Sequence, residues 1–249
     1  MEVKLIAHTQ LSEDFWYELS TKNYGMAWDL TENKITNGQA VALTAIRTCY
    51  SHNKPSEILV KEANKYFYRG ATDDKGGTDA DRLFRHIVNS GHTSTLEHLS
   101  FTFAIEGVSR ALLAQLTRHR VGFSYSVQSQ RYCRFGSGDK SGGFKYVIPP
   151  SVEKNDHAYR EYELAMIEIQ NLYDELRFLG VPPEDARMIL PNAATTNLVM
   201  TANLRALLDF YSKRRKGRGA QAEIADLAEK LREAVVAVEP WTDAFFEQA

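Results

Sequence analysis

The sequence predicts an α+β fold in which helices pack on a mixed, largely antiparallel sheet. Two short segments, 3–7 and 101–105, alternate apolar and polar side chains as half-buried strands do. Longer segments repeat apolar residues every three or four positions as amphipathic helices do, most clearly over 162–176. The sequence has no internal repeat or low-complexity tract, so we predict a single domain over residues 1–249.

The first half of the chain is predicted to hold two strands and two helices. Residues 3–7 alternate apolar and polar side chains well enough to predict a strand at the start of the chain. Residues 39–50 and 78–90 are helix-like, and a glycine follows the second of them as a stop signal. Polar, glycine-rich residues 70–78 predict a loop between these helices. The strand over 101–105 is expected to end at the glycine two positions further on.

The rest of the chain is predicted to be mainly helical. A helix over 108–120 places apolar residues four apart, with polar groups at its C-terminal end on the same side. Residues 136–143 predict a second glycine-rich loop, and 146–148 predict a short strand before two prolines. The apolar stripe of 162–176 predicts a long helix that a glycine ends. Further helices are predicted over 182–187, 202–216 and 219–238.

The composition is that of an ordinary folded protein and excludes several classes. Hydrophobic residues make up 43% and charged residues 25% of the chain, which excludes collagen-like, disordered and disulfide-scaffold proteins. A chain of 249 residues can bury a core without disulfides or a structural metal. The formal net charge is −2, so no overall field attracts nucleic acid or an anionic membrane. Any site for an anion must therefore be local.

The cysteines and the start of the sequence predict a cytoplasmic protein. Cys49 and Cys133 form no CxxC pair, which argues against a zinc ribbon and suits a reducing compartment. The first residues lack the basic and apolar regions of a secretory signal, and no apolar run is long enough for a bilayer. We therefore expect no association with a membrane.

Arg118, His119 and Arg120 stand at the end of a predicted helix and begin a dense polar segment. Basic residues in a last helical turn complement the helix dipole, so a solvated helix end is the simplest interpretation. Arg131 and Arg134 follow, however, among several serines. Guanidinium groups beside hydroxyls bind anionic oxygens well. In a chain of net charge −2, this concentration favours a binding site for an anionic ligand.

His92, Glu97 and His98 form a second cluster, which is open to more than one interpretation. Helical zinc motifs need two histidines and a glutamate on one helix face, and Ser94 stands where an HxxEH motif needs histidine. A structural pair with satisfied hydrogen bonds is the simpler alternative. A metal hydrolase that uses this cluster and His119 remains a competing hypothesis, although we expect no metal.

The strongest run of basic residues is 213–218. Most such runs are solvated, and we expect one arginine of this run to face a ligand. An alternative function is a nucleic-acid-binding module that uses the basic segments 118–134 and 213–218, with interleaved aromatic residues for base stacking. The glycines of 136–143 match neither a Walker loop nor a Rossmann loop.

The triplet Arg118-His119-Arg120 with the later Ser129-Gln130-Arg131-Tyr132 resembles the signature of the flavin-dependent thymidylate synthases. The resemblance runs from about residue 47 to the C-terminus. Its further segments, in the family's order, are Gly91-His92, Glu97-His98, Gln115, Ala186-Arg187, Asn203-Leu204-Arg205, Arg214, Ala220-Gln221 and Pro240-Trp241-Thr242. The family has seven residues between the triplet and the serine, whereas this chain has eight, which leaves the geometry of this loop open.

The resemblance implies a single catalytic domain of this family's type, with glycine-rich loop insertions near 70–78 and 136–143. It implies the FAD-dependent reductive methylation of dUMP to dTMP, the reaction of de novo dTMP biosynthesis. The implied carbon donor is 5,10-methylenetetrahydrofolate and the implied reductant is NADPH. The implied assembly is a homotetramer with shared active sites, in the cytoplasm, without nucleic acid or membrane as a partner.

The resemblance also implies roles for individual residues. Contacts with FAD are implied for His92, Ser94, Glu97, Arg118, His119, Arg120, Asn203 and Asp209. Contacts with dUMP are implied for Gln115, Ser129, Arg131, Arg187 and Arg214. Arg214 and Ser129 are the implied catalytic residues. The resemblance implies that the Arg214 guanidinium polarises the uracil by hydrogen bonding and that Ser129 orients the substrate without forming a covalent bond.

Overall fold

The structure is a computed structural model that describes residues 1–248. These residues divide into two compact units. The first unit consists of Met1–Lys4, Phe103–Met200 and Lys213–Lys230. The second unit consists of Leu5–Thr102, Thr201–Ser212 and the chain from Leu231 onward. A single catalytic domain over the whole chain stays a prediction.

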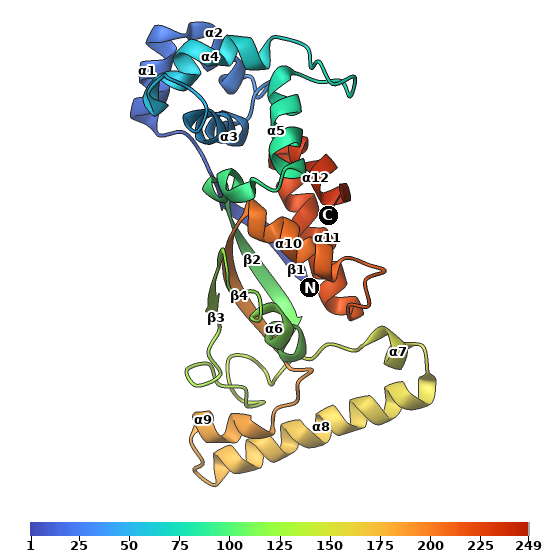
Figure 1. Cartoon of the computed structure of the whole chain (residues 1–249). Coiled ribbons are helices and arrows are strands. Elements are labelled where there is room, and N and C mark those ends of the chain that lie inside the picture. The colour runs from blue at the N-terminus through green and yellow to red at the C-terminus, as the bar shows by residue number, and fades with distance from the viewer. Residues whose placement is uncertain (249) are drawn as a thin grey trace. The chain divides into compact units, whose positions relative to one another are not determined.

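Four strands form one sheet in the order β1-β2-β4-β3 (Figure 1). Their bounds are Glu2–His8 for β1, Ser100–Ser109 for β2, Phe123–Val127 for β3 and Thr195–Asn203 for β4. The sheet is antiparallel and is accompanied by helices, which confirms the predicted α+β class.

Strand β2 continues two residues beyond Gly107, where the sequence predicts its end. Gly107 has a positive φ of 69°, which glycine adopts readily, and its N–H donates to Asn197 Oδ1 at 3.0 Å. The strand therefore passes through the glycine. Strands β3 and β4 are missing from the sequence prediction. A signal for β3 exists, because Phe123, Tyr125 and Val127 alternate with serines.

The second unit contains several short helices before and after its strands. They are α1 (Glu13–Lys22), α2 (Tyr24–Thr31), α3 (Asn37–Thr48), α4 (Ile58–Phe67), α5 (Asp79–Asn89) and α12 (Asp243–Gln248). Short 3-10 helices occupy η1 (Pro55–Glu57), η2 (Thr93–His98) and η4 (Pro240–Thr242). Helices α3 and α5 confirm the predictions over 39–50 and 78–90. Helix α1 is missing from the prediction because it buries a single side chain, Leu19, and so has no apolar stripe.

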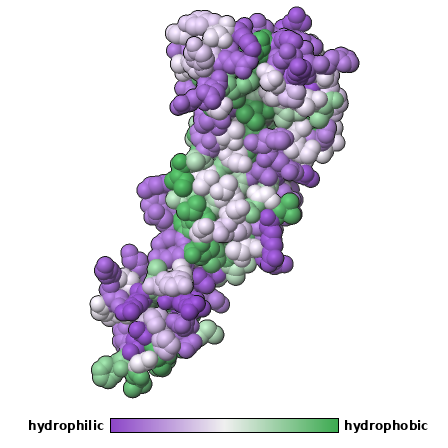
Figure 2. Space-filling view, turned by 90° about the vertical axis from the view of Figure 1, so that its left-hand side faces the viewer, coloured by the Kyte–Doolittle hydropathy of each residue, from purple (hydrophilic) through white to green (hydrophobic). Residues whose placement is uncertain are grey.

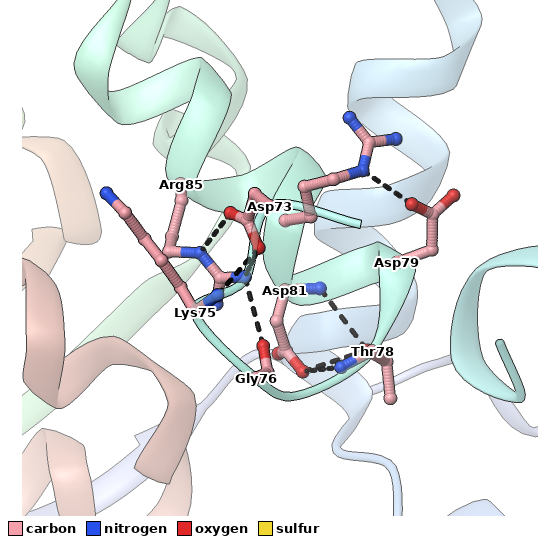
Figure 3. A network of polar contacts seen from close by, with 8 residues as sticks. Asp73, Lys75, Gly76, Thr78, Asp79, Asp81 and Arg85 are labelled. Carbon is pink, nitrogen blue, oxygen red and sulfur yellow. Dashed lines mark hydrogen bonds and ion pairs between the residues drawn. The ribbon is translucent and has the colours of Figure 1, made fainter. Parts of the chain in front are cut away.

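Polar contacts hold the glycine-rich loop 70–78 against the start of α5 (Figure 3). Arg85 donates to both carboxylate oxygens of Asp73, at 3.0 and 2.8 Å, and to the carbonyl of Gly76 at 3.1 Å. Asp81 accepts from the backbone N–H of Thr78 at 2.7 Å and forms a capping box with it. These contacts fix the loop to the first turns of the helix.

The variant Gly77→Ala is expected to lower the free energy of unfolding by about 1–2 kcal/mol. Gly77 has a φ of +78°, and a Cβ there would lie 2.6 Å from Asp81 Oδ2. Urea denaturation at pH 7 measures the change. The matched control is Gly70→Ala, whose Cβ would have no neighbour within 4 Å and which is expected to change stability by less than about 0.5 kcal/mol. Equal losses in the two variants would contradict this account.

The first unit contains one long helix and several short ones. They are α6 (Arg110–Leu116), α7 (Pro150–Glu153), α8 (Asp156–Phe178), α9 (Pro183–Ala186) and the 3-10 helix η3 (Arg187–Ile189). Helix α8 confirms the prediction over 162–176, and Gly180 ends it with a φ of +86°. Its inner face packs in an apolar cluster of Phe135, Phe144, Met166, Tyr173, Ala186 and Ala194.

The strand predicted over 146–148 is wrong. Tyr146 forms only an isolated bridge with Ala194. The Lys145 carbonyl accepts from the N–H of Thr195, the first residue of β4, at 2.8 Å, and the N–H of Val147 donates to the Ala193 carbonyl at 2.9 Å, so pairing stops at the edge of β4. The two prolines that follow remove backbone donors and limit the pairing of this segment.

Helices α10 (Leu204–Arg214) and α11 (Ala222–Val238) confirm the predictions over 202–216 and 219–238. Helix α10 begins two residues later than predicted, because β4 ends at Asn203. No helix within residues 1–248 is long and apolar enough to cross a membrane.

The C-terminal end of α8 and the 3-10 helix η3 expose large apolar side chains. Phe178 is 90% exposed, Leu179 68% and Met188 79%. Figure 2 shows the resulting hydrophobic area, in green, at its lower end, where the end of α8 lies. Apolar areas of this kind are typical of contact surfaces.

Candidate functional site

The triplet Arg118-His119-Arg120 lies in a turn and not in a helix. Helix α6 is shorter than the predicted 108–120, because β2 takes its first two residues and the last helical residue is Leu116. The hydroxyl of Tyr125 on β3 donates to the carbonyls of Leu116 and His119, at 3.0 and 2.7 Å. Burial raises the pKa of Tyr125, so the hydroxyl stays a donor. Tyr125 therefore fixes the turn that carries the triplet.

His119 and Arg214 are in direct contact within the first unit. Arg214, the last residue of α10, donates from Nε to His119 Nε2 at 3.1 Å. His119 therefore accepts with Nε2, and in its neutral form it carries its proton on Nδ1. The contact leaves the terminal nitrogens of Arg214 as donors. The predicted FAD contact and the predicted catalytic arginine are thus adjacent.

Arg118 and Arg120 flank this pair with exposed side chains. Within residues 1–248 neither guanidinium forms an ion pair. The turn therefore presents positive charge that the described chain does not neutralise. Such a set of donors fits an anionic or electron-rich ligand.

Gln115 lies on the last turn of α6 and is half-buried. Its Nε2 donates to Gln221 Oε1 at 2.5 Å and to the Ala111 carbonyl at 3.4 Å. Gln221 lies just before α11 and is a contact for which the sequence analysis offers no role. A pair of residues 106 positions apart gives no signal in the local sequence pattern.

Two predicted dUMP residues, Arg131 and Arg187, share one neighbour. Arg131 Nε lies 3.6 Å from a carboxylate oxygen of Glu184, and Arg187 Nε donates to the Glu184 carbonyl at 3.0 Å. Burial, together with the nearby charge of Arg187, lowers the pKa of Arg110. Arg110 is a cation that the sequence analysis does not single out. Cations placed this close favour an anion between or beside them.

Ser129 hydrogen-bonds only to neighbouring backbone groups within residues 1–248. Its Oγ accepts from the backbone N–H of Arg131 at 3.2 Å, and its carbonyl accepts from the backbone N–H of Cys133 at 3.0 Å. Within residues 1–248 neither a histidine nor a carboxylate bonds to this hydroxyl, although a serine nucleophile needs such a base.

The other predicted FAD residues belong to the second unit. Glu97 accepts from Arg205 Nη1 at 2.5 Å, and His92 Nδ1 lies 3.0 Å from the hydroxyl of Tyr50. Asn203 Oδ1 accepts from the backbone N–H of Ala206 at 2.9 Å at the start of α10. Each of these side chains is therefore held by a neighbour within its own unit.

Two cavities of the second unit are lined by predicted FAD residues. Ser94 lines a largely apolar cavity of about 490 Å³ together with Cys49 and His98. Asp209 and Arg205 line a second cavity of about 410 Å³. Both volumes lie in the range of small-molecule sites. No three histidine, cysteine or acidic side chains within residues 1–248 converge to hold a metal ion.

The basic run has one member in this site and others in the turn that follows α10. Arg214 contacts His119, whereas Lys216 and Arg218 are exposed in a segment with positive φ at Gly217 and Gly219. The expectation that one arginine of the run faces a ligand stays a prediction.

Comparison with protein families gives a match over most of the chain. The sequence model of the family described as thymidylate synthase complementing protein matches residues 31–241. The flavin-dependent thymidylate synthase of Geobacter sulfurreducens is 41% identical over 201 residues, which cover 81% of this chain and 78% of that protein. The enzyme of the same description from Thermococcus onnurineus is 45% identical over 156 residues, which cover 63% of this chain and 62% of that protein.

Solved structures share the fold at lower identity. Thymidylate synthase X from Helicobacter pylori, solved with FAD and dUMP, has a TM-score of 0.64 at 24% identity, over 100% of this chain and 98% of that chain. The UMP/dUMP methylase PolB from Streptomyces cacaoi, solved with 5-Br dUMP, has a TM-score of 0.67 at 21% identity. That match covers 99% of this chain and 94% of the methylase chain.

Proposed function

The chain belongs to the family of flavin-dependent thymidylate synthases, enzymes that convert dUMP to dTMP, and we propose that its own triplet and Arg214 carry this reaction. The observation that carries the proposal is the contact between Arg214 Nε and His119 Nε2 at 3.1 Å. It joins a residue of the signature to the arginine proposed to act on the pyrimidine. The proposed carbon donor is 5,10-methylenetetrahydrofolate, and the proposed reductant is NADPH.

The described residues fit FAD as the cofactor. The unneutralised guanidiniums of Arg118 and Arg120 suit a flavin that becomes anionic on reduction, and His119 lies between them. The apolar cavity beside Ser94 suits a flat aromatic ring. The proposed FAD residues are His92, Ser94, Glu97, Arg118, His119, Arg120, Asn203 and Asp209. FAD, when bound, supplies the reducing equivalents for the methyl group.

The proposed role of Arg214 is electrostatic. Its contact with His119 holds the guanidinium by Nε, so the terminal N–H groups are available to the carbonyl edge of the uracil. Hydrogen bonds from a cation stabilise negative charge that develops on the ring during methylation. Ser129 is proposed to orient the nucleotide, because its hydroxyl accepts from Arg131 N–H and has no base beside it within residues 1–248.

The proposed dUMP site uses the remaining cations and amides of the first unit. Arg131 and Arg187 are proposed to bind the phosphate, because guanidinium forks pair with phosphate oxygens through two parallel hydrogen bonds. Arg110 adds a cation near Arg187. Gln115 is proposed to contact the sugar or the base.

The proposed assembly is a homotetramer with shared active sites, and the proposed location is the cytoplasm. The exposed apolar side chains at the end of α8 support contact with a second copy. The thiols of Cys49 and Cys133 are free, which suits a reducing compartment. Light scattering of the purified protein measures the assembly, and a monomeric mass would contradict it.

Bound flavin and nucleotide binding test the proposed function together. The purified protein is expected to be yellow, to release FAD on denaturation and to change its flavin absorbance when dUMP is added. A colourless protein that does not take up added FAD would overturn the proposal. Salt-dependent binding of oligonucleotides without binding of dUMP would favour the nucleic-acid alternative instead.

A further inference from the structure

The start of α11 contacts α6 at both ends of that short helix. At the end of α6, Gln115 Nε2 donates to Gln221 Oε1 at 2.5 Å. At its beginning, Glu223 accepts from the backbone N–H of Ser109 at 2.7 Å and from its hydroxyl at 2.5 Å. Ser109 is 3% exposed and caps α6 through its hydroxyl, which accepts from Leu112 N–H at 2.9 Å. Residues 221–223 therefore set both the position of α6 and the orientation of Gln115.

Gln221 is itself well placed to hold another side chain. Its carbonyl accepts from the backbone N–H of Ala225 at 3.1 Å, which joins it to the first turn of α11. Its side-chain oxygen is therefore presented from the end of a regular helix. Sites held by helices are more precise than sites held by loops.

The contacts of Gln115 fix which of its polar atoms is available. Both bonds that it makes within residues 1–248, to Gln221 Oε1 and to the Ala111 carbonyl, use its nitrogen. The amide oxygen Oε1 accepts no hydrogen bond from the described residues. Because an amide oxygen accepts and does not donate, it recognises a hydrogen-bond donor of a ligand.

We propose that Gln221 is a positioning residue that holds the carboxamide of Gln115, so that Gln115 Oε1 accepts from an N–H or O–H donor of the bound nucleotide. This inference rests on the proposed function, in which Gln115 contacts dUMP. The donor is either the N3–H of the uracil or a hydroxyl of the sugar. Without the Gln221 oxygen, the carboxamide is free to turn its nitrogen toward that donor and the hydrogen bond is lost.

The test is a set of dUMP affinities for variants of the flavin-loaded enzyme. Gln221→Met keeps the side-chain length but removes the acceptor, and we expect dUMP to bind about five- to tenfold more weakly. Gln221→Glu keeps an acceptor oxygen and is expected to bind within about threefold of wild type. In both variants, kcat at saturating dUMP, FAD content and melting temperature are expected to stay near wild type. Glu233→Met, on the exposed part of α11, is the matched control.

A double-mutant cycle separates positioning from a structural effect. In the Gln115→Met background, Gln221→Met is expected to have no further effect on dUMP affinity, because the side chain that it holds is gone. Full additivity of the two losses would overturn the inference, and so would wild-type affinity in Gln221→Met. Failure of the wild-type enzyme to bind dUMP would overturn the proposed function itself, which distinguishes the two failures.

Two nucleotide analogues identify the donor. N3-methyl-dUMP lacks the base N–H, so wild type and Gln221→Met are expected to bind it with equal affinity if the base is the donor. 2′,3′-Dideoxyuridine monophosphate lacks the sugar hydroxyl, so the two proteins are expected to bind it with equal affinity if that hydroxyl is the donor. A difference that persists with both analogues would overturn the inference.

Discussion

Replacement of Arg214 by alanine is expected to lower dTMP formation by a factor of about 100 to 1,000 and to leave FAD bound. In the structure Arg214 contacts His119 through Nε, which leaves its terminal nitrogens as donors for the proposed contact with the pyrimidine. Under the proposed role, loss of the guanidinium removes the hydrogen bonds that stabilise charge developing on the uracil. The backbone of α10 is unaffected, because alanine has the highest helix propensity.

Turnover at saturating dUMP and the flavin absorbance of the purified variant measure the two parts of this prediction. Arg218→Ala is the control, since it removes a cation from the same basic run at an exposed position. The control is expected to keep turnover within about threefold of wild type. If Arg214→Ala keeps near-normal turnover, the assigned role is wrong. If it loses FAD as well, Arg214 holds the cofactor instead of acting on the pyrimidine.

Replacement of Glu239 by leucine is expected to lower the free energy of unfolding by about 3 kcal/mol. Glu239 is 2% exposed and lies between α11 and η4, and its side chain contacts the start of α3 in the second unit. Its carboxylate accepts from the Thr36 hydroxyl, from the Gly38 backbone N–H at 3.0 Å and from Trp241 Nε1 at 2.6 Å. Leucine has a similar volume but no acceptor, so these donors lose their partner in a buried place.

Denaturation by urea at pH 7, followed by tryptophan fluorescence, measures this change. Glu239→Gln is expected to lower the free energy of unfolding by less than Glu239→Leu does, because the amide oxygen of glutamine can still accept a hydrogen bond. Glu233→Leu, on the exposed part of α11, is the control and is expected to change stability by less than about 0.5 kcal/mol. A Glu239→Leu variant as stable as wild type would contradict the role of this carboxylate as an acceptor for three donors.

The pH dependence of the Glu239 contribution has a definite sign. Burial raises the pKa of this carboxyl above its ordinary value of 4.5. The folded protein therefore holds a proton that the unfolded chain releases, so the stability contributed by this pKa shift is fully present below pH 4.5 and is lost as pH rises through the raised pKa. The hydrogen bonds from the three donors do not depend on this proton and account for the loss predicted at pH 7. The stability difference between wild type and Glu239→Leu is expected to shrink as pH rises through this window. A difference that grows instead would show that the carboxylate is ionised at low pH.

Several regular helices could be predicted from the sequence because their packing leaves a local signal, whereas α2 and α4 are missing from the prediction. Helices α8, α10 and α11 bury one face each, so apolar residues recur at helical spacing. Helix α1 leaves no such signal, since it buries only Leu19, although Ser12 provides an N-cap. Helix α6 was predicted too long at both ends, because β2 continues through Val108 to the N-cap Ser109 and the helix ends at Leu116, before the polar residues of the following turn.

The sequence was enough to propose which residues belong to the candidate site, but not which of them contact one another. The triplet and the serine after it lie close together in sequence and form a recognisable motif. The contact between His119 and Arg214 joins residues 95 positions apart, and that between Gln115 and Gln221 joins residues 106 apart. Tertiary packing alone brings such residues together, so no pattern in a single sequence predicts the partner of either side chain.

The most direct test of the assigned function is the product of the purified, flavin-loaded protein. The protein is incubated with dUMP, 5,10-methylenetetrahydrofolate and NADPH without oxygen, and the nucleotides are separated by chromatography and identified by mass. We expect dTMP to form at the expense of dUMP, and to form only when all three co-reactants and FAD are present. A folded protein that binds FAD and leaves dUMP unchanged under these conditions would contradict the account.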